Sequence, residues 1–373
     1  MEPIVSLELF AGVGAQMAAL TRLGIPIRKR YVCEIDEQAY RSYCAIHGDT
    51  PNLGDIIKVE HLPTVDLVTW SYPCTSVSIA GKQEGMAEGS GTASSLGWEV
   101  IRLLKDAKER GCLPNDLVME NVPALLQKRN IPEFERMCTE LEKLGYTNSY
   151  AVMNAKDYGV PQSRKRVFMV SSLHKGRFIF PGGFPLTRCV KDIMEDDGDV
   201  DKTCYLSPER IKHFEEHRIR QEENGRNFGW KPVDPNGVMN AVTTNPDRHS
   251  SGNFLILAGN IRDWNYEKAG RVYSPEGCSP TVETPSGGGR MPKFIVQKDP
   301  LMARYITPRE AWRLMDFTDE QIDRAFGVTA SKTQRYKQAG NSIVVACLEH
   351  IFKGMYIDGT WEAPRQTVLD DWL

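Results

Sequence analysis

The sequence predicts an α/β fold in which helices flank an open sheet. Short apolar runs of strand length alternate with amphipathic helical patterns through the amino-terminal two thirds of the chain, as in repeated β-α-β units. A glycine-rich turn joins the first apolar run to the first helical pattern, and polar residues follow the later runs. Ligands bind at the carboxyl ends of strands in open α/β sheets, so the pattern also predicts where a functional site lies.

The first two expected strands end in residues suited to hold a nucleotide-like ligand. Ile4 to Leu9 runs into the turn Phe10-Ala11-Gly12-Val13-Gly14, where backbone N–H groups at a helix start can approach a ligand closely. Lys29 to Cys33 ends at Glu34, whose spacing from the glycines suits hydrogen bonds to ribose hydroxyls. Asp55 is a candidate partner for an adenine amino group. The alternative for the glycine turn is a tight corner without a ligand. Glu34 could instead be a helix-cap neighbour, and Asp55 could be an ordinary turn aspartate.

Four further apolar runs predict strands, and two amphipathic segments predict helices. The strands are expected over Val65 to Thr69, Asp116 to Glu120, Thr147 to Met153 and Lys165 to Ser171. The helices are expected over Leu96 to Lys108 and Ile131 to Leu144. Arg164 and Arg166 alternate at the start of the last strand, so we expect both side chains on one face.

A cysteine follows a proline at the end of the strand Val65 to Thr69. The segment Trp70 to Ser76 contains Pro73-Cys74, and a glycine-rich stretch from Gly81 to Gly91 comes next. A thiol in this place, beside a loop able to close over it, is placed like a nucleophile. The alternatives are a small buried hydrophobe for the cysteine and a surface loop without a role for the glycines.

The order of these motifs resembles that of the DNA (cytosine-5)-methyltransferases of bacterial or phage type. The matching segments are Phe10-Ala11-Gly12-Val13-Gly14, Glu34, Gly54-Asp55-Ile56, Pro73-Cys74 with Ser78, Glu120-Asn121-Val122, Gln162-Ser163-Arg164-Lys165-Arg166, Thr307-Pro308-Arg309-Glu310 with Arg313-Leu314-Met315-Asp316-Phe317, and Gln338-Ala339-Gly340-Asn341-Ser342. Each motif alone is a weak signal. Eight of them in the family's order, over nearly the whole chain, are specific.

The resemblance implies a Rossmann-like S-adenosylmethionine-dependent methyltransferase sheet with a smaller, mostly β or irregular target-recognition domain. The catalytic, cofactor-binding domain would comprise residues 1–174 and 301–356, the target-recognition domain 175–300, and a tail without an interpretable role 357–373. The implied reaction transfers a methyl group from S-adenosylmethionine to carbon 5 of cytosine in a specific duplex DNA sequence. It proceeds through a covalent Cys74 adduct after the base is flipped out of the duplex.

The chemistry explains why the implied catalytic residues belong together. Carbon 5 of cytosine is too weak a nucleophile to attack a methyl sulfonium, so a thiolate must first add to carbon 6, and the resemblance assigns this attack to Cys74. Glu120 is expected to supply a proton or a strong hydrogen bond at N3 of the base. It is therefore expected to have a raised pKa. Arg166 is expected to hold O2. Arg164 would support the loop, and Asn121 would order it through backbone contacts.

The resemblance also implies binding residues. Those implied for S-adenosylmethionine are Phe10, Ala11, Gly12, Gly14, Glu34, Ile35, Asp55, Ile56, Pro73, Asn341 and Ser342. Those implied for DNA are Ser78, Gly81, Gln83 and Gln162. A final apolar helix over Ser342 to Tyr356 would pack back against the first helices, bringing Asn341 near the methionine part of the cofactor. A capping box is expected at Thr307 and Glu310, with proline at the first helical position.

Four positions depart from the family's common pattern. Thr75 and Val77 stand where glutamine and phenylalanine are common, Ala15 stands in place of a glycine, and Ser90 replaces a frequent basic residue near the loop tip. None removes a group that the chemistry requires. They put in doubt the details of loop closure and leave the reaction type unchanged.

The insert between the arginine motif and the last two motifs contains an internal repeat. Pro235, Gly237, Val242, Thr244 and Phe254 recur forty positions later as Pro275, Gly277, Val282, Thr284 and Phe294. We interpret two copies of a strand, an exposed loop and a returning strand. Our hypothesis is that Arg248 and Arg290, one in each loop, read guanine edges or hold phosphate; the equal alternative is two hairpins with solvated arginines. Pro208 to Arg226 is expected to form an exposed helix.

Composition narrows the remaining possibilities. The 373 residues carry a net charge of −3, so DNA binding must rely on a local basic face. The nine cysteines are scattered without a Cys-x-x-Cys pair, which argues against a disulfide framework and a metal site. No apolar stretch predicts a membrane span or signal peptide, so we expect a cytoplasmic protein without membrane contact.

Partners and rival activities follow from the same resemblance. Double-stranded DNA is the expected partner of a monomeric enzyme. A cognate restriction endonuclease is possible, with no stable complex expected. Two alternatives stay open from the sequence: a tRNA cytosine-5 methyltransferase and a catalytically inactive DNA-binding homologue.

Overall fold

The computed structural model describes residues 1–73, 85–196, 198–204, 209, 257–260, 271–273, 279–280, 293–298, 301–305 and 307–362. The chain divides into two compact units. Unit 1 comprises Met1–Met153, Lys165–Gly183 and Val345–Leu373, and unit 2 comprises Asn154–Arg164 and Phe184–Val344. This division groups residues 301–344 with unit 2, whereas we predicted them for the catalytic domain. The functional domain boundary stays a prediction.

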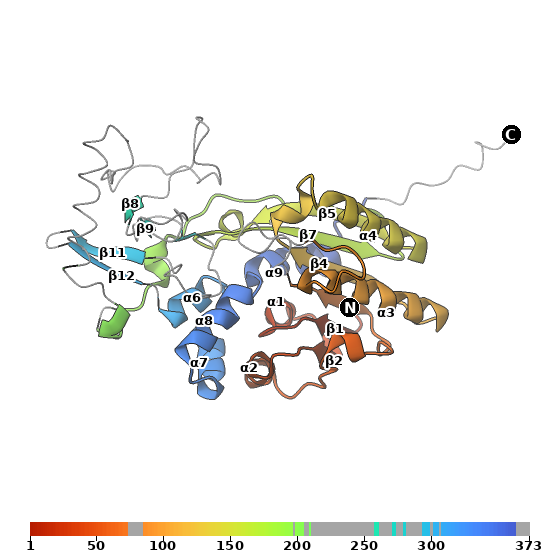
Figure 1. The fold of residues 1–373 in the computed structure, drawn as a ribbon, viewed down its shortest axis with the longest axis horizontal. Helices are drawn as coiled ribbons and strands as arrows, with labels where there is room; N and C mark the ends of the chain where they lie inside the picture. The colour runs from red at the N-terminus through yellow and green to blue at the C-terminus, as the bar shows by residue number, and fades with distance from the viewer. Residues whose placement is uncertain are drawn as a thin grey trace. The chain divides into compact units, whose positions relative to one another are not determined.

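Unit 1 is built on a six-stranded sheet (Figure 1). Its strands are β1 (Ile4–Leu9), β2 (Ile27–Cys33), β3 (Leu67–Trp70), β4 (Asp116–Asn121), β5 (Thr147–Asn154) and β7 (Lys165–Ser172), in the order β2-β1-β3-β4-β7-β5. The pairs β1–β2, β1–β3 and β3–β4 are parallel, whereas β4 and β7 are antiparallel. The predicted α/β class and the six expected strands are confirmed, with ends shifted by at most two residues.

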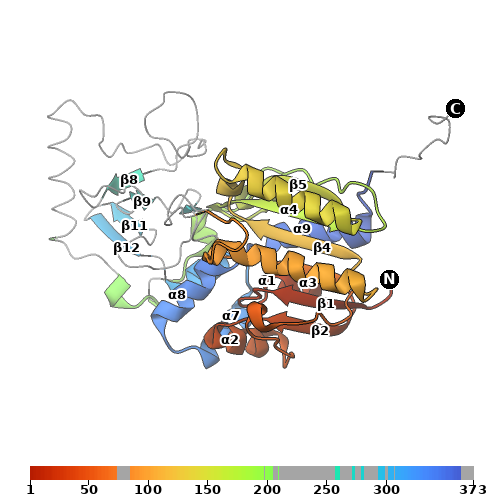
Figure 2. The same cartoon turned by 45° about the vertical axis from the view of Figure 1, so that its right-hand side comes forward.

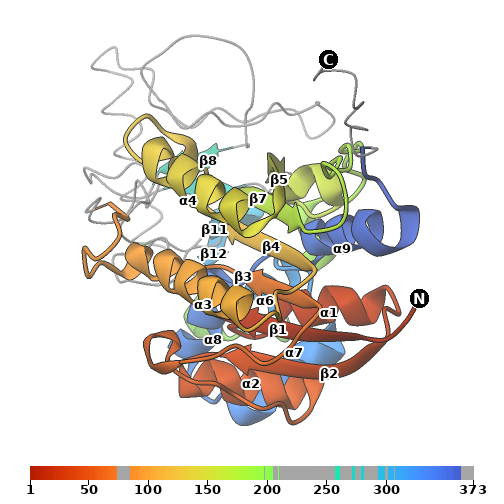
Figure 3. The same cartoon turned by 90° about the vertical axis from the view of Figure 1, so that its right-hand side faces the viewer.

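Helices cover both faces of this sheet. They are α1 (Ala15–Arg22), α2 (Glu37–His47), α3 (Gly97–Glu109), α4 (Ile131–Leu144) and α9 (Val345–Lys353), which continues as a π-helix over Gly354–Asp358. Figures 2 and 3 show α3 and α4 on one face and α1 and α9 on the other. The contact between α1 and α9 confirms the prediction that the final apolar helix packs back against the first helix.

Local sequence explains where the helices begin and end. The side chain of Asp36 accepts hydrogen bonds from the backbone N–H groups of Gln38 and Ala39 and so caps α2. Helix α4 has proline in its first turn and ends at Gly145, which adopts the left-handed conformation that glycine tolerates. Its buried residues recur at helical spacing and face the sheet: Phe134, Met137, Leu141 and Leu144.

The main core lies between the sheet and helices α3 and α4. Alternate residues of β1, namely Val5, Leu7 and Leu9, join this apolar cluster. Ser6 and Glu8 therefore belong to the other face of the strand, and both are buried.

Unit 2 combines short strands and helices. Its strands are β6 (Gln162–Ser163), β8 (Leu257–Asn260), β9 (Arg271–Tyr273), β10 (Ser279–Pro280), β11 (Lys293–Lys298) and β12 (Leu301–Tyr305). β6 pairs with β10, and the other four form a sheet in the order β12-β11-β9-β8. Its longer helices are α6 (Pro308–Arg313), α7 (Asp319–Val328) and α8 (Lys332–Asn341).

The carboxyl-terminal helix start in unit 2 matches the sequence prediction. The Thr307 hydroxyl accepts a hydrogen bond from the Glu310 N–H, and the Glu310 carboxylate accepts one from the Thr307 N–H. The predicted capping box is confirmed. The repeat loops lie outside the described residues, as does nearly all of the helix expected over Pro208 to Arg226. Within the described part of the chain, no helix has the length and apolar character needed to cross a membrane.

The buried carboxyl of Glu8 gives a prediction about pH. The side chain is 1% exposed, the Tyr43 hydroxyl donates to its Oε1 over 2.5 Å, and burial raises the pKa of Glu8 to about 7. The folded protein therefore holds this proton more tightly than the unfolded chain does, so Glu8 lowers the free energy of unfolding as pH rises from about 5 to about 7. Glu8→Gln keeps a hydrogen-bond acceptor for the Tyr43 hydroxyl and should remove this pH-dependent fall in the free energy of unfolding.

Denaturant unfolding of both proteins at several pH values across that window checks this. The wild-type stability should fall relative to that of the Glu8→Gln variant as pH rises, and parallel stability curves would show that Glu8 is not the titrating group.

Candidate active site

The carboxyl ends of the parallel strands of unit 1 lie side by side. Leu9 at the end of β1 is in register with Cys33 of β2 and with Trp70 of β3, and Trp70 is in register with Met119 of β4. The antiparallel strand β7 begins at the same edge, where Val167 pairs with Asn121. This register gathers the predicted cofactor turn and the predicted catalytic groups of unit 1 along one edge of the sheet.

The turn after β1 is held in a compact shape by backbone contacts. The N–H of Phe10 donates to the carbonyl of Cys33 over 2.8 Å, and the N–H of Gly14 donates to the carbonyl of Ala11 over 3.0 Å. Phe10, Gly12 and Gly14 all have positive φ angles, of 58°, 55° and 81°. Positive φ is costly for a residue with a side chain, so the surrounding contacts must stabilise Phe10.

Glu34 lies against this turn, and its predicted contact with ribose stays a prediction. Its Oε2 accepts a hydrogen bond from the N–H of Gly12 over 2.8 Å, and its Oε1 accepts one from the N–H of Asp36 over 2.7 Å. Burial raises the pKa of Glu34, and the two backbone hydrogen bonds oppose that rise. The carboxyl is thus fixed beside the glycine turn.

The residues around the turn fit the adenosine part of S-adenosylmethionine. A carboxylate suits ribose hydroxyls, and a Cβ added to Gly12 would meet no atom within 4 Å, so the space over the turn is open. Ile35, next to Glu34, is 75% exposed and presents an apolar surface of the kind that an adenine ring covers. These features would position the cofactor, which supplies an electrophilic methyl group when it is bound.

The next predicted cofactor motif has a structural role that the sequence left open. One oxygen of Asp55 accepts a hydrogen bond from the N–H of Ile57 over 3.1 Å and so caps a short 3-10 helix, Ile56–Lys58. The Ile56 side chain is buried in the core. Contacts of these two residues with adenine stay predictions.

The ends of β4 and β7 bring together two of the predicted catalytic groups. Nε of Arg166 lies 3.0 Å from Oε1 of Glu120, and these side chains are 15% and 11% exposed. Nη1 of Arg166 also donates to the carbonyl of Lys165 over 2.8 Å. The guanidinium is thus held next to the carboxyl in a largely buried place, where each charge stabilises the other.

Asn121 connects the ends of β4 and β3. Its side-chain Nδ2 donates to the carbonyl of Tyr72 over 3.2 Å, and its Oδ1 accepts from the N–H of Val122 over 2.8 Å. Tyr72 precedes Pro73, the last described residue before Cys74. The chain that leads to Cys74 is therefore anchored beside Glu120.

Several predicted residues lie outside the described part of the chain. They are Cys74, Thr75, Val77, Ser78, Gly81, Gln83, Arg248 and Arg290.

Four predicted site residues belong to unit 2. Arg164 is buried and donates through Nη2 to the carbonyls of Gly340 and Ser342, at 3.0 and 2.7 Å, whereas Arg166 pairs with Glu120. Gln162 is fully buried and donates to the carbonyl of Leu314 over 2.6 Å. Contact of the Gln162 side chain with DNA would require it to leave that position. Asn341 is exposed at the end of α8, and the cofactor contacts of Asn341 and Ser342 stay predictions.

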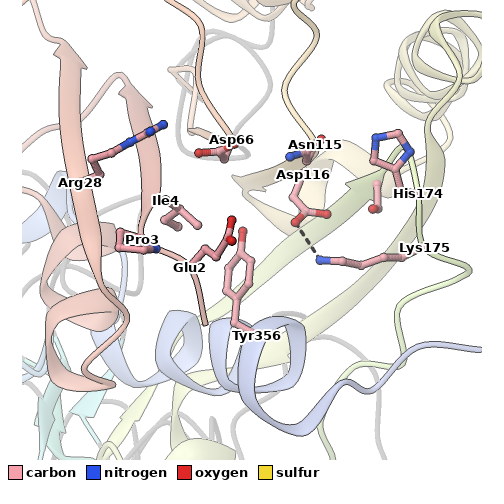
Figure 4. Close-up of a pocket in the computed structure, with 11 residues that line it drawn as sticks. Glu2, Pro3, Ile4, Arg28, Asp66, Asn115, Asp116, His174, Lys175 and Tyr356 are labelled. Atoms are coloured by element: carbon pink, nitrogen blue, oxygen red, sulfur yellow. Dashed lines mark hydrogen bonds and ion pairs between the residues drawn. The ribbon is translucent and has the colours of Figure 1, made fainter.

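One cavity of unit 1 lies at the opposite ends of the strands (Figure 4). It has a volume of about 370 Å³, and its lining includes Ile4 at the start of β1 and Asp66 just before β3. Asp116, at the start of β4, forms an ion pair of 2.9 Å with Lys175 there. Since the cofactor turn follows the other end of β1, this cavity is separate from the candidate active site.

Two residues that position the site were missed by the sequence analysis. Asn52 accepts from the N–H groups of Glu34 and Gly54 and donates to the Glu34 carbonyl, so it joins the first two acidic cofactor motifs. Glu8 lies two residues before Phe10, where the cofactor turn begins, and binds Tyr43 of α2. Asn52 gives no signal in the sequence, but a carboxylate inside an apolar strand could have drawn attention to Glu8.

Fold and site together define an α/β protein with a glycine-rich turn after its first strand and a largely buried carboxyl–guanidinium pair at the same sheet edge. The family model of the C-5 cytosine-specific DNA methylases matches residues 4–356. The chain belongs to this family. It transfers a methyl group from S-adenosylmethionine to carbon 5 of cytosine in DNA.

Individual relatives agree with the family match. The chain is 32% identical to the orphan methyltransferase M.SssI of Spiroplasma monobiae, over 82% of this chain and 69% of that protein. It is 29% identical to the type II methyltransferase M2.ScrFI of Lactococcus lactis subsp. cremoris, over 94% and 98%. Among solved structures, S. pombe Dnmt2 matches with a TM-score of 0.59 and 17% identity, over 94% and 97%. The last comparison supports the fold.

The two glycines of the cofactor turn give a matched test of packing. Both have positive φ, which costs an alanine about 1–2 kcal/mol. A Cβ on Gly14 would also lie 2.5 Å from Nε2 of His47 and 2.6 Å from Cε2 of Tyr43, whereas one on Gly12 would meet nothing. Gly14→Ala should therefore lower the Tm clearly more than Gly12→Ala does, as measured by thermal unfolding without ligand. Equal shifts would contradict the role of the contact with α2.

Proposed function

We propose that the reaction proceeds through a covalent adduct of Cys74 with the target cytosine. The Cys74 thiolate adds to carbon 6, and the electron pair of the 5,6 double bond moves to carbon 5, which attacks the methyl donor. Loss of the carbon 5 proton then lets the thiolate leave and restores the ring. The target carbon is inside the duplex stack, so the nucleotide must rotate out before this chemistry starts.

The observation that carries this proposal is the Glu120–Arg166 pair. Addition at carbon 6 builds negative charge on N3 and O2 of the base. Glu120 would hold a proton at N3, and Arg166, which uses Nε for Glu120 and Nη1 for a backbone carbonyl, would donate from Nη2 to O2. The hydrogen bond from Asn121 to Tyr72 supports placing the neighbouring Cys74 at the same edge.

The wider setting of the enzyme follows from the same proposal. The substrate is duplex DNA, with residues 175–300 as the target-recognition domain and residues 1–174 with 301–356 as the catalytic domain. The enzyme acts as a cytoplasmic monomer, and a cognate endonuclease, where one exists, forms no stable complex with it. Similarity to both type II and orphan methyltransferases is compatible with either setting.

The covalent step can be tested with DNA containing 5-fluorocytosine. Fluorine at carbon 5 cannot leave as a proton, so an adduct with Cys74 is trapped and should appear as a slow-migrating band on a denaturing gel. Cys74→Ser should abolish both the band and methyl transfer. Cys112→Ser, at a half-buried cysteine of unit 1, serves as the control and should keep both. Adduct formation by Cys74→Ser would rule out Cys74 as the nucleophile.

Glu120→Gln tests the role of the carboxyl at N3. The amide keeps the shape of the side chain and can still donate a hydrogen bond, but it cannot transfer a proton, so we expect methyl transfer to slow by about 10²–10⁴-fold. Binding of S-adenosylmethionine, measured by calorimetry, should change little. A methyl-transfer rate within a few-fold of wild type would exclude the proposal that Glu120 holds a proton at N3.

The hypothesis that Arg248 and Arg290 bind DNA can be tested by sequencing the cytosines that each alanine variant methylates. Substitution of an arginine that reads guanine should relax the methylated sequence at one position, at a cost of about 1–3 kcal/mol. An arginine that holds phosphate should weaken binding uniformly instead. If both alanine variants keep the wild-type affinity for DNA and the same methylated sequence, the alternative holds, and the two arginines are solvated side chains of ordinary hairpins.

A further inference from the structure

The carbonyl group directly before Cys74 is held by a buried serine. The hydroxyl of Ser94 donates to the carbonyl of Pro73 over 2.8 Å, and Ser94 has no exposed surface. Ser94 lies in the 3-10 turn Ala93–Leu96, which leads directly into α3. The contact spans 21 positions of the chain, so it ties the end of β3 to the start of a helix.

The same short region also contacts Gly85 and Met86. The Thr92 hydroxyl donates to the carbonyl of Gly85 over 3.1 Å, and Nε1 of Trp98 donates to the carbonyl of Met86 over 3.0 Å. Residues 92–98 thus contact Pro73 at the end of β3 and also Gly85 and Met86.

The core beneath this region is closely packed. The ring of Tyr72 stacks on Trp70, with centroids 5.6 Å apart, and a Cβ on Gly97 would lie 3.2 Å from the Tyr72 ring. Asn121 holds the Tyr72 carbonyl from the side of β4. The backbone before Cys74 is therefore fixed at two successive carbonyls, by Asn121 and by Ser94.

We propose that Ser94 is a positioning residue for the nucleophile Cys74. A peptide unit is planar, so the Pro73 carbonyl shares its plane with the amide nitrogen and Cα of Cys74. Holding that oxygen sets the orientation of the plane from which the thiol side chain extends. Misplacement of a reacting atom by about 1 Å can cost about 10²-fold in rate. The inference rests on the proposed role of Cys74.

Ser94→Ala tests the proposal, because it removes the donor and keeps the small size of the side chain. We expect about tenfold slower methyl transfer at saturating DNA and cofactor, and an equally slower formation of the covalent complex with 5-fluorocytosine DNA. Binding constants for DNA and S-adenosylmethionine should stay within about twofold of wild type, since Ser94 contacts neither in this proposal. Ser94→Thr, which keeps the hydroxyl, should recover most of the rate.

Ser95→Ala is the matched control. Ser95 lies in the same turn, and its hydroxyl donates to the carbonyl of Thr92 over 2.7 Å, so the variant loses a local hydrogen bond without touching Pro73. It should keep the wild-type rate of adduct formation. A wild-type rate for Ser94→Ala, or an equal loss in both variants, would overturn the positioning role.

Two results separate failure of this inference from failure of the proposed function. If the wild-type protein forms no covalent complex, the nucleophilic role of Cys74 fails, and the role of Ser94 falls with it. If wild type forms the complex and Ser94→Ala forms it equally fast, only the role of Ser94 fails. Thermal unfolding of each variant shows whether a lost rate reflects lost folding.

Discussion

The register of the parallel strands is the constraint on which the site depends. Leu9, Trp70 and Met119 are adjacent in three neighbouring strands, so the chain segments that follow them leave the sheet at one edge. Side chains alternate along a strand, and a slip of one residue would turn β4 over and direct Glu120 to the opposite face. The alternation of β4 limits such slips, because its residues Leu117 and Met119 belong to the apolar cluster under α3 and α4.

The shape of the cofactor turn is maintained by packing between segments that are distant in the sequence. Tyr43 of α2 is fully buried, binds Glu8 of β1, and lies with His47 against the place where a Cβ of Gly14 would be. Nε2 of His47 is 3.3 Å from the carbonyl of Val13. The turn is therefore not an independent loop, and its unusual φ angles persist because β1 and α2 fix it from below.

Local patterns in the sequence predicted the six strands of the unit 1 sheet, helices α3 and α4 and the capping box, because each depends on residues a few positions apart. They predicted less of the site, because its side chains find partners far along the chain. Gln162 binds the carbonyl of Leu314, and Arg164 binds the carbonyl of Gly340, each more than 150 positions away. The resemblance to a family motif placed Gln162 and Arg164 near the active site. No periodicity in the sequence indicates that their side chains bind distant backbone carbonyls. Ser94 gave no signal for the same reason.

The Glu120–Arg166 pair shows why a guanidinium suits this site. Removing a carboxylate from water is costly, and the cation 3.0 Å away offsets part of that cost. In the proposed mechanism, Glu120 shares a proton with N3 when charge develops on the base. A guanidinium carries its N–H donors in one plane, so Arg166 can keep Nε on Glu120 and offer another N–H to O2. A lysine ammonium is a point charge without this fork geometry. In the proposed mechanism, Arg166 therefore positions Glu120 before the base binds and stabilises the negative charge that develops on the base afterwards.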